Sequence, residues 1–316
     1  MNHLVKLERF LIIGHILAMS FGLAGLLIVL PHPELIASLS TSGQTLFRWS
    51  MAGGGVVYII LGAAAVAIYA YRTLGLWQWL TFMVPAVVIS LSSELLGTST
   101  GFPFGEYAYL SGLGYKIASL VPFTIPLSWF YMGFVCYLIA RAAMDAGVAV
   151  GKKVSRVDSI GAIFLGAMLL TAWDFALDPA MSRTAFPFWY YGQQGAFFGT
   201  PYQNFAGWLI TAIVFMTVAR GFWQKTSLTL SRKQLLLPVI IYVSNVIFGA
   251  VIAIVAAGLW IPVELSIVLG IMPVLALWGQ TASQSTPKLI EQLEDTPAAI
   301  KPNAEVPIES AGVMSK

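Results

Sequence analysis

Residues Trp173–Trp208 read WDFALDPAMSRTAFPFWYYGQQGAFFGTPYQNFAGW, and they guide the interpretation of the whole chain. The stretch begins in an apolar helix, which we expect to end at Pro179 because proline lacks a backbone N–H. An aromatic, glycine-rich loop then leads into the next apolar helix. Asp174 and Asp178 lie four residues apart and therefore share one helix face. Acids are costly in membrane-spanning segments, so both are candidate functional residues.

The composition of the chain is that of an integral membrane protein. Of its 316 residues, 58% are hydrophobic and only 10% are charged, whereas soluble domains have about 25% charged residues. The small net charge of +3 and the lack of a basic patch argue against nucleic-acid binding. A single cysteine, Cys136, leaves no pair for a disulfide and no cysteine metal site.

Eight segments are apolar and long enough to cross a bilayer, which takes about 20 residues per helix. We place them at Leu7–Leu30, Met51–Tyr71, Trp77–Leu96, Val121–Ala140, Ser159–Leu177, Phe205–Ala219, Leu236–Ala257 and Ile261–Trp278. The sequence thus predicts an all-α, multi-pass membrane protein in the bilayer of a bacterial cell membrane or internal membrane, with a single helical domain over residues 1–280. Residues 281–316 are polar and proline-rich, and we expect them to form a disordered cytoplasmic tail.

Lysine and arginine indicate the orientation, because they concentrate on the cytoplasmic side of membrane proteins. With eight spans, 14 of the 17 basic residues fall on one side, and only Arg48, Lys116 and Arg183 fall on the other. Both termini are therefore predicted to be cytoplasmic. No strands are expected in the outer loops. Of these loops, Pro31–Trp49 is mildly amphipathic and should lie along the interface, and Gly97–Leu120 is rich in glycine and aromatic residues.

Six of the 14 acids map to the outer half of the protein, namely Glu34, Glu94, Glu106, Asp174, Asp178 and Glu264. Several helices thus bring carboxyl groups to one depth, as a site between helices requires. Glu94, Asp174 and Asp178 are placed near helix C-termini, where the negative end of the macrodipole disfavours an anion. A carboxyl group that keeps its proton there is suited to general acid catalysis.

Aromatic residues crowd the same region, and two interpretations of them stay open. Rings at this depth are typical of the aromatic belt at a membrane interface. They can also line a cleft for a long apolar ligand, with π faces that stabilise a carbocation. The candidates for substrate contact are Tyr107, Trp173, Trp189, Tyr190, Tyr191, Tyr202, Asn204 and Trp208. Asn204 either caps the sixth helix or orients a water molecule. Three histidines and one cysteine supply too few ligands for haem or zinc, so no metal or cofactor is expected.

Three segments resemble the integral-membrane carotenoid 1',2'-hydratases of the CruF type. They are ELLGTSTGFPFGEYAY at Glu94–Tyr109, WDFALDPAM at Trp173–Met181 and FWYYGQQGAFFGTPYQNFAGW at Phe188–Trp208. The resemblance implies addition of water to the 1',2' double bond at the ψ-end group of γ-carotene or lycopene, on a route to myxol-type carotenoids. It also implies that no redox cofactor or metal is needed, and that a downstream carotenoid glycosyltransferase is a partner.

Hydration of such an alkene begins with proton delivery to its less substituted carbon, which leaves a tertiary cation for water to capture. We expect Asp174 or Asp178 to supply the proton, with Glu94 and Glu106 as partners for water. An ionised carboxylate and the faces of aromatic rings would stabilise the cation.

Two other function classes fit parts of the sequence. The spacing of Asp174 and Asp178 resembles the second acidic motif of membrane aromatic prenyltransferases, which hold Mg²⁺ against a diphosphate. Their first motif and a neighbouring basic cluster are missing here, and the acids lie on the outer side. Intramembrane acids also serve proton-coupled transporters, but those usually contain an internal repeat, and the sequence shows none.

Overall fold

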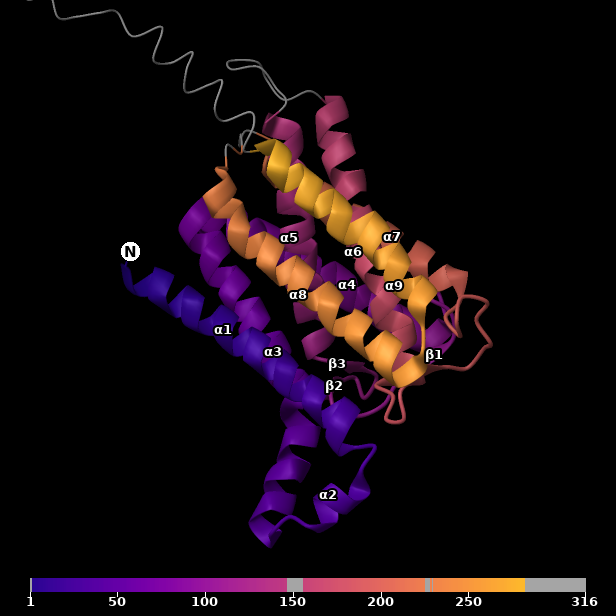
Figure 1. Cartoon of the computed structure of the whole chain (residues 1–316). Helices are drawn as coiled ribbons and strands as arrows, with labels where there is room; N and C mark the ends of the chain where they lie inside the picture. The colour runs from indigo at the N-terminus through magenta and orange to yellow at the C-terminus, as the bar shows by residue number, and fades with distance from the viewer. Residues whose placement is uncertain (1, 147–155, 225–227, 229, 282–316) are drawn as a thin grey trace, which may run out of the picture.

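A bundle of membrane-length helices makes up the computed structural model, which describes residues 2–146, 156–224, 228 and 230–281 (Figure 1). Within these residues, eight helices are long and apolar enough to cross a membrane: Asn2–Val29, Gly53–Leu74, Leu76–Thr100, Thr124–Asp145, Val157–Arg183, Tyr202–Phe222, Arg232–Ala257 and Trp260–Thr281. The eight predicted spans and the all-α class are confirmed. The predicted tail lies outside the described residues, Thr281 apart.

The elements follow one another as α1 (Asn2–Ala24), η1 (Gly25–Val29), α2 (Pro33–Ala37), α3 (Thr41–Leu74), α4 (Leu76–Thr100), β1 (Tyr107–Tyr109), β2 (Lys116–Ile117), β3 (Val121–Pro122), α5 (Thr124–Ala146), α6 (Arg156–Arg183), β4 (Trp189–Tyr191), α7 (Tyr202–Phe222), α8 (Arg232–Ala257), α9 (Trp260–Ser266) and η2 (Ile267–Ile271). The π-helical turns η1 and η2 continue α1 and α9. The expectation of strand-free outer loops is wrong, because β1 pairs with β4 and β2 pairs with β3, both antiparallel.

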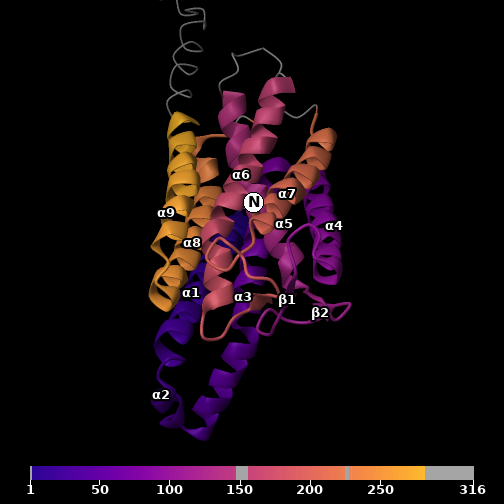
Figure 2. The same cartoon turned by 90° about the vertical axis from the view of Figure 1, so that its right-hand side faces the viewer.

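The central helix of the bundle is α5, which packs against α3, α4, α6 and α8 (Figures 1 and 2). Every residue from 128 to 142 is buried, as expected of a helix that is apolar on all sides. The helix begins three residues later than the predicted span, because Val121 and Pro122 form strand β3 before α5 starts at Thr124.

Helix α6 does not end at Pro179, contrary to the expectation from the sequence. It continues to Arg183 with Pro179 inside it. Proline removes one backbone hydrogen bond of the helix, but the residues that follow it, Ala180 and Met181, are buried at 0% and 4% exposure. Their packing holds the chain in the helix for another turn. The candidate acids of α6 therefore lie within the helix and not at its end.

The segment Pro31–Trp49, which the sequence predicts to lie along the interface, is largely helical. It contains the short helix α2 and the first part of α3, whose 34 residues run without a break from Thr41 to Leu74. The side chain of Ser40 caps α3 by accepting the backbone N–H of Gly43 at 3.2 Å. Together, α2 and the start of α3 project from the bundle beyond the other helices (Figure 1).

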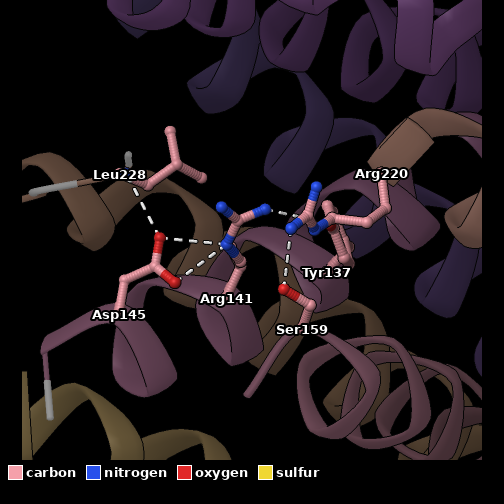
Figure 3. A network of polar contacts seen from close by, with 6 residues as sticks. All are labelled: Tyr137, Arg141, Asp145, Ser159, Arg220 and Leu228. Carbon is pink, nitrogen blue, oxygen red and sulfur yellow. Dashed lines mark hydrogen bonds and ion pairs between the residues drawn. The ribbon is translucent and has the colours of Figure 1, made fainter. Parts of the chain in front are cut away.

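A polar network closes the end of the bundle opposite the strands (Figure 3). Arg141 of α5 is buried, and its Nε lies 2.9 Å from each carboxylate oxygen of Asp145. The carboxylate of Asp145 also accepts the backbone N–H of Leu228 at 3.2 Å. Arg220 of α7 donates to the hydroxyl of Ser159 of α6 at 2.9 Å. These contacts hold the ends of three helices and the segment after α7 around the buried Arg141 and the partly buried Arg220.

Helix α1 lies at the edge of the bundle and is attached by two polar contacts. Near its start, Arg72 of α3 binds Glu8 through both carboxylate oxygens, at 2.8 and 3.1 Å. Midway along α1, the fully buried His15 donates from Nδ1 to the carbonyl of Tyr58 at 2.7 Å and accepts from Asn245 of α8 at 3.1 Å. His15 is thus a satisfied buried residue, which anchors α1 to α3 and α8.

The loop that follows α4 is held in place by two glycines. A Cβ atom on Gly97 of α4 would lie 2.7 Å from the ring of Phe104, and one on Gly207 of α7 would lie 2.6 Å from the same ring. Phe104 is 2% exposed. The ring of Phe104 therefore sits between two helices at positions where only glycine leaves enough room, and this fixes the start of strand β1.

We expect Gly207→Ala to lower the stability of the protein, because the new methyl group would overpack the contact with Phe104, typically by about 1–3 kcal/mol. Gly221→Ala is the matched control on the same helix, since nothing lies within 4 Å of a Cβ at that position. Thermal unfolding of both variants in detergent measures the effect. Equal unfolding temperatures for the two variants would contradict this account of the loop.

Candidate active site

Glu94 of α4 is buried, with 3% of its surface exposed, and it accepts three hydrogen bonds. Trp129 of α5 donates to Oε1 at 2.9 Å, Tyr109 donates to Oε2 at 2.8 Å, and Tyr107 also donates to Oε2. A carboxylate has about four acceptor positions. Three donors therefore satisfy Glu94 in its ionised form and leave one position on Oε1 available.

Asp178 of α6 has a matching set of three donors. Trp189 donates to Oδ1 at 2.6 Å, while Tyr191 and Asn204 donate to Oδ2 at 2.6 and 3.3 Å. The same Asn204 amide donates to Asp174 at 2.8 Å. Asp174 is fully buried, and its Oδ1 has no partner among the described residues. The two aspartates thus share one donor, as neighbours on the helix face that their spacing predicts.

The pairing of β1 with β4 positions four of these donors. The register pairs Tyr107 with Tyr191, Ala108 with Tyr190, and Tyr109 with Trp189. Side chains alternate between the two faces of a strand. The first and last residues of each strand, which form the first and last of these three pairs, therefore face the carboxylates. The middle pair faces away, and Tyr190 is 49% exposed. Two loops far apart in the sequence therefore supply one donor pair to Glu94 and one to Asp178.

The three tyrosines are suited to act as permanent donors. Burial raises the pKa of Tyr107, Tyr109 and Tyr191 well above the usual value near 10. The neighbouring charge raises the pKa of each phenol further, from Glu94 for Tyr107 and Tyr109 and from Asp178 for Tyr191. All three phenols therefore stay protonated at neutral pH and hold their hydrogen bonds to the carboxylates.

A cavity of about 50 Å³ lies between Glu94 and Asp178. One water molecule needs roughly 10–15 Å³ of such volume, so the cavity can hold a few. Its wall is aromatic: Trp129 and Trp208 stack with ring centroids 4.2 Å apart, and Trp173 meets Trp208 edge to face at 5.8 Å. No lysine, arginine or histidine is among the described residues that line it. Its chemistry is that of carboxyl groups, phenols and π faces.

Two further cavities adjoin this one. An apolar cavity of about 40 Å³ shares Ile125, Ser128, Trp173, Leu177 and Trp189 with it. On the outer surface, an open polar hollow is lined by Ser182, Arg183, Tyr190, Tyr191, Gly192, Gln193, Gln194 and Gly199. Tyr191 lines both the hollow and the carboxyl cavity. The site therefore lies between a hydrocarbon-like space and a water-accessible one.

Most of the predicted site residues come together. The cavity between the acids is lined by Glu94, Asp178, Tyr107, Trp173, Trp189, Tyr191, Asn204 and Trp208, and Asp174 lies behind Asn204. Glu106, Tyr190 and Tyr202 have exposed side chains and do not line it. Of the two roles considered for Asn204, the side-chain cap of α7 is not formed, and the Asn204 amide instead bridges two aspartates by hydrogen bonds. Its role in orienting a water molecule stays a prediction.

The predicted effect of the helix macrodipole is weaker than expected. Glu94 lies six residues before the end of α4 at Thr100, and Asp178 lies five residues before the end of α6 at Arg183. The macrodipole acts mainly within the last turn. The local donors, and not the helix ends, therefore set the environment of both acids.

Two residues that hold Glu94 were not predicted. Tyr109 follows Tyr107 at a spacing of two, which is the signal of a strand, but three residues are too few to reveal a strand on their own. Trp129 lies within an entirely apolar helix, where nothing in the sequence distinguishes a tryptophan that donates a hydrogen bond from one that only packs.

Comparison with known proteins adds a family and one relative. Residues 54–273 match the family described as "Carotenoid biosynthesis protein". A protein named bisanhydrobacterioruberin hydratase, from Haloarcula japonica, is 31% identical over 132 residues, which are 42% of this chain and 41% of that relative. The match thus spans about two fifths of the length of the relative. No solved structure is significantly similar to the chain.

We expect Tyr109→Phe to destabilise the protein by about 1.5–3 kcal/mol, the usual contribution of a hydrogen bond to a charged group, because it removes one donor from Glu94 without changing the shape of the core. Tyr190→Phe is the matched control, since the exposed Tyr190 faces away from the acids on the partner strand. The unfolding temperature of each variant in detergent is the measurement. A wild-type temperature for Tyr109→Phe would show that this donor does not support the fold.

Proposed function

The chain belongs to the family of carotenoid biosynthesis proteins. We propose that it is a carotenoid hydratase, a hydro-lyase that adds water to the acyclic ψ-end group of a carotenoid such as γ-carotene or lycopene. The observation that carries this proposal is a small cavity that combines two buried acids with an aromatic wall and has no basic residue in its lining. The name of the Haloarcula japonica relative supports the same reaction class.

The proton comes from the aspartate pair. Asp174 and Asp178 share the Nδ2 of Asn204, and two such close carboxyl groups are expected to hold one proton between them because like charges repel. Only Asp178 lines the cavity, so Asp178 donates the proton to the alkene and Asp174 resupplies it. The π electrons of the double bond form the new C–H bond at the less substituted carbon.

The resulting tertiary cation lies between carboxylates and aromatic faces. Glu94 and the deprotonated Asp178 stabilise its charge, and the stacked pair of Trp129 and Trp208 presents π faces to it. Water then forms the C–O bond, and its extra proton passes to the available position on Glu94 Oε1. Transfer of that proton back to the aspartate pair through cavity water completes the cycle, so the net change is the addition of one water molecule. Glu106 has no role in this scheme.

Water reaches the site from the polar hollow on the outer surface. Tyr191 stands between the hollow and the carboxyl cavity and lines both. Gln193, Gln194 and Arg183 make the hollow hydrophilic, so a movement of the Tyr191 ring is sufficient to admit water next to Asp178.

The alternative functions fit this site less well. A prenyl diphosphate needs a metal held by several acids or a cluster of basic side chains. Among the described residues, no group of three or more metal-binding side chains is present, and the cavity lining contains no basic residue. A proton-coupled transporter would need the acids exposed in turn to both sides of the membrane, whereas Glu94 and Asp178 are buried here, each at 3% exposure.

We expect the protein to convert lycopene or γ-carotene, accumulated in an engineered bacterium, to a more polar pigment that is heavier by one water molecule and has an unchanged absorption spectrum. Asp178→Asn should lower the yield of this pigment at least about 100-fold, as the loss of a general acid does. Asp174→Asn should lower it about tenfold, because the pair loses its proton reserve. Chromatography and mass spectrometry of the extracted pigments measure both.

Glu264→Gln serves as the matched control, because Glu264 is an acid of the same outer half but is exposed on α9. Its pigment yield should equal that of the wild type. Wild-type yield from a folded Asp178→Asn variant would refute the assignment of the acid. Unchanged pigments from folded wild-type protein with both substrates would refute the hydratase proposal, and assays of prenyl transfer and proton flux would follow.

A further inference from the structure

The proposed reaction uses the carboxyl cavity and the polar hollow but leaves the adjoining apolar cavity without a role. The substrate of the proposed hydratase is a rod of about 40 carbon atoms, and only its end group reacts. The rest of the rod must leave the site in some direction. Resting on the proposed function, we infer that the hydrocarbon chain of the substrate occupies the apolar cavity, where α3, α6 and α8 meet.

The lining of this cavity matches a hydrocarbon. None of its described lining residues carries a charge, and its wall includes Ile59 of α3, Met181 of α6 and Phe248 of α8. Two polar groups at its edge are already bound: the Ser128 hydroxyl donates to the Ile125 carbonyl at 2.8 Å, and the indole N–H of Trp173 donates to the Asn245 carbonyl at 3.3 Å. Apolar surface is favoured in such a space and disfavoured in the polar hollow on the other side.

The apolar cavity adjoins the reacting centre. It shares both Trp173 and Trp189 with the carboxyl cavity, and the indole of Trp189 donates to Asp178 at 2.6 Å. A chain that fills the apolar cavity therefore has its end close to the proton donor, on the other side of these two indoles. This proximity favours the apolar cavity as the place of the chain.

A pair of aromatic rings closes the cavity toward the bilayer. Tyr58 and Phe248 face each other with ring centroids 5.3 Å apart, one from α3 and one from α8. Helix α1 covers the pair from outside, because a Cβ on Gly22 would lie 3.9 Å from the Phe248 ring. The apolar cavity is therefore closed by the two rings and by α1 behind them.

The cavity is small in this structure, at about 40 Å³, so entry of the chain requires side chains to move. Met181 is suited to this, because methionine is unbranched and adapts its shape to irregular spaces. Because the cavity is so small, a single phenylalanine side chain is large enough to fill it. Filling a cavity commonly stabilises a protein, so such a variant is expected to fold.

The test fills the cavity from two sides in the full chain. Ile59→Phe and Met181→Phe introduce a ring at positions that are 2% and 4% exposed, and Val57→Phe adds the same ring on the lipid-facing side of α3 as a matched control. Each variant is expressed in bacteria that accumulate lycopene and is purified in detergent. The carotenoid bound per protein is measured by absorbance, and hydrated product in the cells is measured by chromatography and mass spectrometry.

We expect both filling variants to lose at least about tenfold in bound carotenoid and in product, the usual size of steric discrimination in an apolar pocket, while Val57→Phe matches the wild type. Wild-type binding and product in either filling variant that unfolds at the wild-type temperature would overturn the inference. Failure of the proposed function looks different: the wild type then binds carotenoid without hydrating it. Loss of that bound carotenoid on filling would still place the chain in this cavity.

Discussion

An ionised carboxylate inside a membrane bundle is stable only where hydrogen-bond donors replace the water it has lost. Glu94 and Asp178 both meet this condition, and each does so with one indole and at least one phenol. The donors come from α5 and from two outer loops, so the position of each loop is tied to an acid. This end of the bundle is therefore arranged around the two acids, and the aromatic residues gathered there both donate hydrogen bonds to the acids and line the cavity between them.

The spans and the meeting of the acids could be predicted from the sequence, because a bilayer requires apolar segments of a certain length and loops of one side gather at one depth. The spacing of Asp174 and Asp178 likewise predicted their common face. The pairing of β1 with β4 could not be predicted, since it joins three-residue segments about 80 positions apart. It depends on tertiary contacts such as that of Phe104 with Gly97 and Gly207. For the same reason, the continuation of α6 beyond Pro179 and the donor role of Trp129 became visible only in the structure.

A reaction between water and a hydrocarbon needs both reactants in one place, although they do not mix. In this protein, the polar hollow and the apolar cavity reach the carboxyl cavity from different sides. Under the proposed function, Tyr191 lies on the side from which water comes, and Trp173 and Trp189 lie on the side of the hydrocarbon. The acids then lie at the boundary, where a proton can move to carbon before bulk water reaches the cation.

Because side chains alternate along β1 and β4, the lengths of the two loops that carry these strands are restricted. Between Glu94 and Tyr107, or between Asp178 and Trp189, an insertion of one residue that shifted the register by one would turn the inward rings outward and leave a buried charge without donors. An insertion of two would keep the inward and outward faces. Among natural variants of this chain, loop lengths in these two segments should therefore change in even steps or not at all, even though both segments lie at the surface, where loops usually vary freely.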